Sequence, residues 1–144
     1  RVLRYTLQSN ESQSVSLREE MEFASAYIFL LKMRFENNLQ FDIQIAKSFE
    51  DYRLPPMAVQ VLIENAVKHN EISDRKPLTI HIVTNNEGYL SVSNDIQPKR
   101  TAASGTGIGL VNLAKRYRLL FKQDIQITED KEFSVCIPLI DEVQ

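Results

Sequence analysis

Three of the four glycines in the chain, Gly105, Gly107 and Gly109, lie within the short stretch "ASGTGIGL". A chain of this length holds about ten glycines on average, so the cluster marks a place where the backbone needs freedom. Small residues let main-chain N–H groups approach an oxygen closely, and a helix that begins there adds partial positive charge. The stretch therefore predicts a polyphosphate site, with a plain tight turn before a helix as the alternative.

A second group of polar side chains lies on the segment "MAVQVLIENAVKHN". At about 100° per residue, its apolar residues fall on one face of a helix, and the opposite face carries Glu64, Asn65 and Lys68 together with Val61. An amide, a carboxylate and an ammonium within one turn indicate a phosphate and metal site, and solvent exposure is the alternative. The glycine spacing fits neither the dinucleotide fingerprint nor the P-loop, so neither of those nucleotide sites is expected.

Hydrophobic periodicity outlines the elements that must position these groups. Ser16 and Glu19 form the pattern of a capping box before a helix expected over residues 17–38. The pair Pro55-Pro56 precedes a second helix, expected over about residues 56–70, because proline is tolerated in a first helical turn.

A third helix is expected after the glycines, from 110 to 121. Alternating apolar residues predict a strand at 41–45 and two hairpins, over 78–92 and 125–139. This order lacks the strict alternation of parallel units. We therefore expect an α/β (α+β) two-layer sandwich with a mixed, mostly antiparallel sheet and helices on one face.

The composition limits the classes of function. The 144 residues are enough for about one domain, and the net charge of -2 offers no general attraction for nucleic acid or anionic lipid. A single cysteine, Cys136, excludes an internal disulfide, and two scattered histidines argue against a zinc cluster. No apolar run reaches the ~18 residues that span a bilayer. We expect a cytoplasmic domain, and the start at Arg1 suggests a piece of a longer protein.

The two polar motifs together resemble a known family. "LIENAVKHN" and "GTGIGLVNLAKRY" are similar to the N box and second glycine box of the GHKL (Bergerat) ATP-binding fold of sensor histidine kinases, gyrase-type ATPases and related chaperones. "LRYTL", "LREEMEFASAYIFLLKMRF" and the closing "FSVCIPLI" resemble segments of LytS-like sensor kinases. The resemblance implies that residues 1–15 are the tail and linker of an upstream dimerisation segment and that residues 16–144 are an ATP-binding catalytic domain.

The resemblance also implies roles for individual residues. Asn65 would give its amide oxygen to a Mg²⁺ ion held by the triphosphate of ATP, and Lys68 would contact the phosphates. His69 matches an aromatic or histidine position beside the nucleotide, with a solvated or sugar-side place as the open alternative, and Glu64 would give polar support to catalysis. The second glycine box would cradle the phosphates with Gly105, Thr106, Gly107, Ile108, Gly109 and Leu110.

The first glycine box of the family is altered in this chain. Where the family has an aspartate that binds the adenine amino group, followed by glycines, the chain reads "LSVSNDIQPK". Strand alternation turns Asn94 to the same face as Leu90 and Val92 and turns Asp95 away. We therefore predict Asn94 as the adenine contact, at a loss of about 1 kcal/mol for the missing charge, with Asp95 as the second candidate. Weak nucleotide binding is expected.

The family's hydrolytic members carry a carboxylate one turn before the asparagine, and Val61 stands there. The resemblance therefore implies a histidine kinase domain that passes the γ-phosphate of ATP to a histidine on an absent dimerisation segment, and then to a response regulator receiver domain. The parent protein is expected to be a homodimer anchored in a bacterial membrane. Two alternatives stay open: a degenerate signalling scaffold with little or no nucleotide binding, and an ATP-hydrolysing switch.

Overall fold

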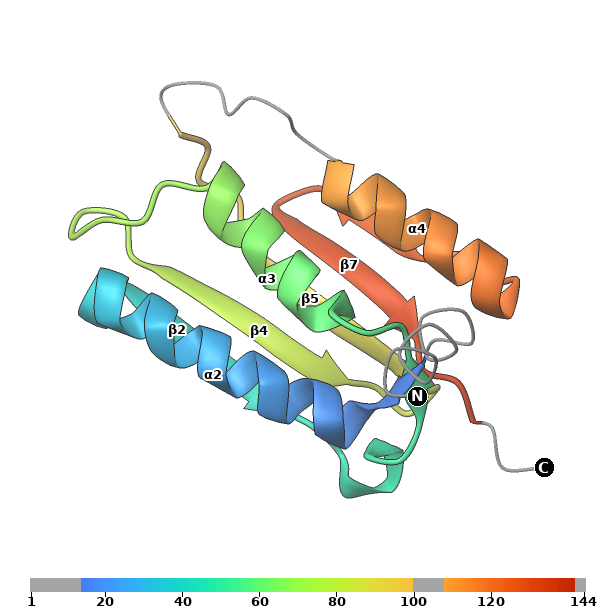
Figure 1. Cartoon of the computed structure of the whole chain (residues 1–144). Helices are drawn as coiled ribbons and strands as arrows, with labels where there is room; N and C mark the ends of the chain where they lie inside the picture. Colours follow the sequence, from blue (N-terminus) through green and yellow to red (C-terminus); the bar gives the residue numbers. More distant parts are fainter. Residues whose placement is uncertain (1–13, 100–107, 142–144) are drawn as a thin grey trace, which may run out of the picture.

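The computed structural model describes residues 14–99 and 108–141 and shows one main sheet with helices on one face (Figure 1). The strands of this sheet are β2 (Leu39–Gln44), β4 (Leu78–Thr84), β5 (Tyr89–Asp95), β6 (Gln126–Glu129) and β7 (Glu132–Pro138). Their order is β2-β4-β5-β7-β6, in which β2 and β4 are parallel and the other neighbours antiparallel. The two-layer, mostly antiparallel sandwich predicted from the sequence is confirmed.

The helices of the described residues cross the sheet side by side, with α3 between α2 and α4 (Figure 1). Their bounds are α2 (Leu17–Phe35), α3 (Ala58–His69) and α4 (Ile108–Phe121), and two short 3₁₀ turns are η1 (Glu36–Asn38) and η2 (Lys47–Phe49). A small antiparallel pair, β1 (Val15–Ser16) with β3 (Arg53–Leu54), joins the start of α2 to the chain before α3.

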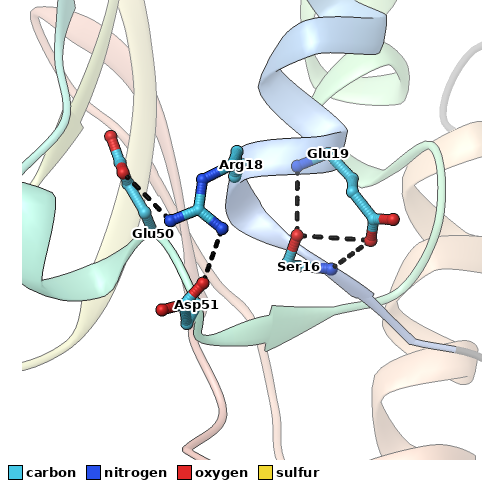
Figure 2. A network of polar contacts seen from close by, with 5 residues as sticks. All are labelled: Ser16, Arg18, Glu19, Glu50 and Asp51. Atoms are coloured by element: carbon cyan, nitrogen blue, oxygen red, sulfur yellow. Dashed lines mark hydrogen bonds and ion pairs between the residues drawn. The ribbon is translucent and has the colours of Figure 1, made fainter.

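The start of α2 has the capping box that its sequence predicts. The Ser16 hydroxyl accepts a hydrogen bond from the Glu19 N–H at 3.1 Å, and Glu19 Oε1 accepts one from the Ser16 N–H at 3.1 Å (Figure 2). Arg18 turns the other way and donates to Asp51 at 2.6 Å and to Glu50 at 3.4 Å, which ties the first turn to the loop after η2 (Figure 2). The capping box joins residues only three apart, so it marks the helix start through local bonds.

Two predicted helix boundaries are wrong by a few residues. α2 ends at Phe35 rather than at 38, because Glu36 adopts a left-handed φ of 53° and the chain continues as the η1 turn. α3 begins at Ala58 rather than at 56, because Met57 has a left-handed φ of 70°, a conformation that an L-residue seldom adopts. Both helix ends are set by a residue with a positive φ, which the spacing of apolar residues does not predict.

The core lies between the helices and the inner face of the sheet. Leu78, Ile80 and Ile82 of β4 are buried, and so are Leu90 and Val92 of β5, as their alternation predicts. The first strand of the second hairpin differs, because β6 is an edge strand and all four of its residues are exposed.

Candidate functional site

A cavity of about 450 Å³ opens beside the C-terminal half of α3. Its walls come from α3, from the chain just after β5, from the first turn of α4 and from the β6–β7 hairpin. The lining residues are Asn65, His69, Asn70, Ile96, Pro98, Leu110, Glu129 and Phe133. Three of the residues that the sequence assigned to a nucleotide site, Asn65, His69 and Leu110, therefore meet at one cavity.

The polar face of α3 does not belong to a single cavity. Glu64 and Lys68 line a second one, of about 390 Å³, on the side of α3 that faces α2. Lys99, from the chain after β5, also lines it, together with Arg34 of α2. The sequence predicted one surface for the amide, the carboxylate and the ammonium, and the helix instead divides them between its two sides.

Residues 105–107 of the second glycine box lie outside the described residues. Its last residues begin α4, where Ile108 and Gly109 are exposed and Leu110 faces the first cavity. A Cβ atom added to Gly109 would lie 3.3 Å from Cγ1 of Val61, so α4 comes very close to α3 at this point. A Cβ atom at this position would fit only if the side chain of Val61 moved by a few tenths of an ångström, so glycine eases the close approach of the two helices.

Asn94 lies on the inner face of β5, as strand alternation predicts, and it is only 2% exposed. Its amide nitrogen donates to the Asp95 carbonyl at 2.7 Å. Across the β5–β7 pair it stands opposite Phe133, which lines the first cavity. Asp95 is exposed, also as predicted. An adenine contact at either residue stays a prediction, and Asn94 is the one placed next to the cavity.

The chain after β5 is fastened to the end of α3, which sequence reasoning missed. Asn70 is 6% exposed, donates to the Ala66 carbonyl at 2.8 Å and accepts from the Gln97 N–H at 2.7 Å. The Gln97 carbonyl accepts from the Glu71 N–H at 2.6 Å, and its side chain donates to the Glu71 carbonyl at 3.0 Å. Asn70 is a polar residue on the apolar face of the predicted helix, and this position could have indicated that its side chain makes buried hydrogen bonds.

The other end of α3 is held by both neighbouring helices. Glu20 of α2 is 3% exposed and accepts from the N–H groups of Met57 at 3.0 Å and Val59 at 2.9 Å. Arg116 of α4 donates to the Pro56 carbonyl. Burial raises the pKa of Glu20, although the backbone N–H groups and the charge of Arg116 oppose the rise, and burial lowers the pKa of Arg116. A carboxylate therefore supplies the cap that α3 lacks in its own sequence.

The charges around α3 suit a polyphosphate. The pKa of His69 is lowered, first by partial burial and then by the positive charges of Lys68 and Lys99. His69 lines the first cavity, whereas Lys68 and Lys99 line the second, so the two ammonium groups lie beside the first cavity rather than in its wall. Among the described residues no cluster of three or more His, Cys, Asp or Glu side chains could hold a metal ion. Magnesium bound to phosphates and water needs few protein ligands, so the single amide of Asn65 fits such an ion.

Known proteins resemble this chain in sequence and in structure. A family model described as "Histidine kinase" matches residues 1–39. Sensor protein LytS of Streptococcus mutans is 34% identical in an alignment of 143 positions that covers 88% of this chain and 24% of LytS. Sensor histidine kinase BtsS of Escherichia coli K12 is 28% identical in an alignment of 120 positions that covers 81% of this chain and 21% of BtsS. The chain spans about a quarter of the length of these relatives.

Solved structures share the fold at lower identity. The catalytic domain of histidine kinase ThkA superposes with a TM-score of 0.59 at 18% identity, covering 90% of this chain and 99% of that one. The cytoplasmic segment of histidine kinase QseC gives a TM-score of 0.55 at 11% identity, covering 85% of this chain and 74% of that one. None of the helices in the described residues has the length and apolar character needed to cross a membrane.

Proposed function

We propose that this chain, which belongs to the GHKL-type catalytic domains of LytS-like sensor histidine kinases, binds Mg-ATP and presents its γ-phosphate to a histidine on a dimerisation segment. The observation that carries the proposal is the meeting of Asn65, His69 and Leu110 at one cavity, with Lys68 and Lys99 on the neighbouring one. From the histidine the phosphate would pass to an aspartate of a response regulator receiver domain. The parent protein would be a homodimer anchored in a membrane, with this domain in the cytoplasm.

The described side chains supply binding and orientation. The apolar walls of the cavity, from Ile96, Pro98 and Phe133, suit a flat base. Asn65 would hold Mg²⁺ through its amide oxygen, and the ion, when bound, would neutralise charge on the triphosphate. Lys68 and Lys99 would attract the phosphates as point charges from the α2 side of the helix. Phosphoryl transfer depends mostly on positioning and charge stabilisation, so this set of groups is sufficient.

The residue one helical turn before Asn65 argues against ATP hydrolysis. Val61 is apolar, and its Cγ1 fills the space next to Gly109, so this position offers no general base for water. A kinase gains from this arrangement, because ATP that is held for transfer to a histidine is not lost to water. The ATP-hydrolysing alternative is therefore disfavoured.

Two features of the altered chain, one at the end of β5 and one just after it, favour the scaffold alternative. Asn94 replaces a charged adenine ligand, and its amide nitrogen is already bonded to the Asp95 carbonyl. Gln97 is bonded to Asn70 where the family has glycines. Both features lower the expected affinity for ATP, and a protein with this fold that no longer bound ATP would signal through conformation alone.

Titration with a fluorescent ATP analogue, with and without Mg²⁺, separates these possibilities. We expect wild-type Kd values between micromolar and sub-millimolar, and about tenfold weaker binding for Asn65→Ala, a change of ~1.4 kcal/mol. Asn94→Ala should also weaken binding, and Asn86→Ala, an exposed amide in the β4–β5 turn, should not. The absence of saturable binding at millimolar nucleotide would establish the scaffold instead.

Transfer needs the parent protein with its upstream segment. We expect γ-labelled ATP to label a histidine there, and Asn65→Ala to abolish the label. Steady release of phosphate without labelled protein would favour the hydrolase.

A further inference from the structure

The second cavity lies between α2 and α3, which are neighbours in the helix layer (Figure 1). Its volume of about 390 Å³ is within the range of ~300–1,000 Å³ that is typical of small-molecule sites. Part of its lining is apolar: Leu31 is 6% exposed, and Phe35, Val67 and Ile72 pack against the core. Small-molecule sites commonly combine apolar walls of this kind with a few polar groups.

Most of the ionisable side chains at this cavity are cations. Arg34 of α2, Lys68 of α3 and Lys99 from the chain after β5 line it, and Glu64 is the one carboxylate among its described lining residues. These residues carry a net charge of +2, whereas the whole chain has a net charge of -2. The three cations come from three separate segments, so the fold, and not a single helix face, brings them together. The charge of the cavity favours an anion as its ligand.

Two aromatic residues of α2 complete the polar part of the lining. The pKa of the Tyr27 hydroxyl is raised, first by burial and then by the charge of Glu64, while Arg34 opposes the rise. The hydroxyl therefore keeps its proton at neutral pH and can donate it to a hydrogen bond with an anion. Cζ of Arg34 lies 4.6 Å from the centroid of the Phe35 ring. A guanidinium that stacks on a ring in this way is held in orientation and still offers its N–H groups to a phosphate.

Asn70 separates this cavity from the first one. Among the described residues it alone lines both cavities. Its amide is engaged on both sides, because it donates to the Ala66 carbonyl at 2.8 Å and accepts from the Gln97 N–H at 2.7 Å. A ligand in the second cavity would therefore be divided from a ligand in the first by α3 and by this buried, bonded amide.

We propose that the cavity between α2 and α3 is a separate binding site for a phosphate monoester that carries an aromatic or apolar body. The phosphate would lie among Arg34, Lys68 and Lys99, and the body would lie against the apolar part of the lining. A phosphate monoester carries about 1.5 to 2 negative charges at neutral pH, which matches the net charge of the described lining residues. The proposal does not depend on nucleotide binding. Its test changes Arg34, which has no part in the proposed nucleotide site.

Methyl NMR of the 144-residue chain locates the ligand, with phenyl phosphate as the probe. We expect it to shift the methyl signals of Val67 and Ile72, which line the second cavity. The signals of Ile96 and Leu110, which line the first cavity, should stay in place. A dissociation constant of about 1 mM is expected, which is ordinary for a ligand of so few atoms.

Two related molecules test the two parts of the ligand. Inorganic phosphate lacks the apolar body and should bind at least ~10-fold more weakly than phenyl phosphate, because it buries no ring. Benzyl alcohol has the ring without the phosphate, and at the same concentration it should cause no shift of Val67 or Ile72. A site for any phosphate ion would instead bind inorganic phosphate as tightly as phenyl phosphate.

Two variants with opposite effects on charge test the cations. Arg34→Gln removes a positive charge and should weaken binding of phenyl phosphate about three- to fivefold, and Glu64→Gln removes the negative charge and should strengthen it by about the same factor. Lys47→Gln is the matched control, because Lys47 is exposed in η2 and does not line the cavity. Its affinity for phenyl phosphate should equal that of wild type.

The proposal would be overturned by unshifted signals of Val67 and Ile72, by shifts of Ile96 and Leu110 in their place, by equal binding of inorganic phosphate, or by wild-type affinity in Arg34→Gln. Titration of Arg34→Gln with the fluorescent ATP analogue should give the wild-type affinity. An equal loss of affinity for both ligands would show one continuous nucleotide site and would also overturn the proposal. A wild-type chain that binds phenyl phosphate but no ATP analogue would support this site and refute the proposed nucleotide site, so the two proposals fail separately.

Discussion

Replacing Glu20 with alanine removes the carboxylate that caps α3 from the neighbouring helix. Two N–H groups at the start of α3, those of Met57 and Val59, then lose their acceptor. Val59 is fully buried, so water cannot easily replace the carboxylate there. The half-buried guanidinium of Arg116 also loses the carboxylate whose charge raises its pKa.

The expected loss of stability follows from these contacts. Leaving a buried donor without a partner costs about 1–3 kcal/mol, and loss of a helix N-cap costs about 0.5–2 kcal/mol. Removing a carboxylate that is costly to bury offsets part of this loss. We expect Glu20→Ala to lower the free energy of unfolding by about 3 kcal/mol in urea, and Glu20→Gln, which keeps one acceptor oxygen, by about half as much.

The control for this measurement is Glu22→Ala, a change of the same kind on the exposed side of α2, which should alter the free energy of unfolding by less than about 0.5 kcal/mol. A Glu20→Ala protein as stable as wild type would refute the assignment of Glu20 as the cap of α3. It would also mean that Glu20 does not hold α3, and therefore Asn65, in place.

The pH dependence of the free energy of unfolding, compared between wild type and Glu20→Gln, tests the role of Glu20 independently. Burial raises the pKa of Glu20 above its value in the unfolded chain. A raised pKa means that the folded protein binds the proton more tightly, so the contribution of Glu20 is greatest below the ordinary glutamate value of about 4.3 and declines as the pH rises through the higher folded value. The stability of wild type relative to Glu20→Gln should therefore fall between pH 4 and pH 7, and a rise would contradict the burial argument.

Three further changes test contacts of α3, of α4 and of the chain after β5. Gly109→Ala alone should change stability by less than about 0.5 kcal/mol, because the gain in helix propensity is offset by the tight contact with Val61, but it should add about 1 kcal/mol in a Val61→Ala background. Tyr117→Phe should cost about 1–2 kcal/mol in urea, since its fully buried hydroxyl donates to a β7 carbonyl at 2.8 Å. Asn70→Ala should speed amide exchange of Gln97 at least ~10-fold, and unchanged exchange would show that the bond between them does not hold this segment.

Features set by neighbours in the sequence were predicted correctly. The capping box of Ser16 and Glu19 joins residues three apart, and the β4–β5 hairpin joins adjacent strands around Gly88, which has a left-handed φ of 85°. The inward phase of Asn94 follows from strand alternation alone. In each case the determining residues lie close together in the chain, so their spacing carries the information.

Features set by contacts between distant segments were missed. The Glu20 cap joins residues 37 and 39 positions apart, and Asn70 meets Gln97 across 27 positions. The periodicity of α3 placed Glu64, Asn65 and Lys68 on one face, but the division of that face between two cavities depends on where α2 and α4 lie. No local pattern specifies the packing of those helices.

The hydrogen bonds that hold both ends of α3 limit how the candidate site can respond to a ligand. Glu20 and Arg116 fix its start to both flanking helices, and Asn70 fixes its end to Gln97. Asn65 lies between these anchors, so its place relative to the sheet is determined before any nucleotide arrives, and binding need not order it. Glycines after β5 would let the backbone adapt at the cavity wall, whereas here the bonds of Gln97 hold that wall. If the proposed nucleotide binds here, it must either fit the existing cavity or break those bonds, so we expect Asn70→Ala to change the affinity for the ATP analogue.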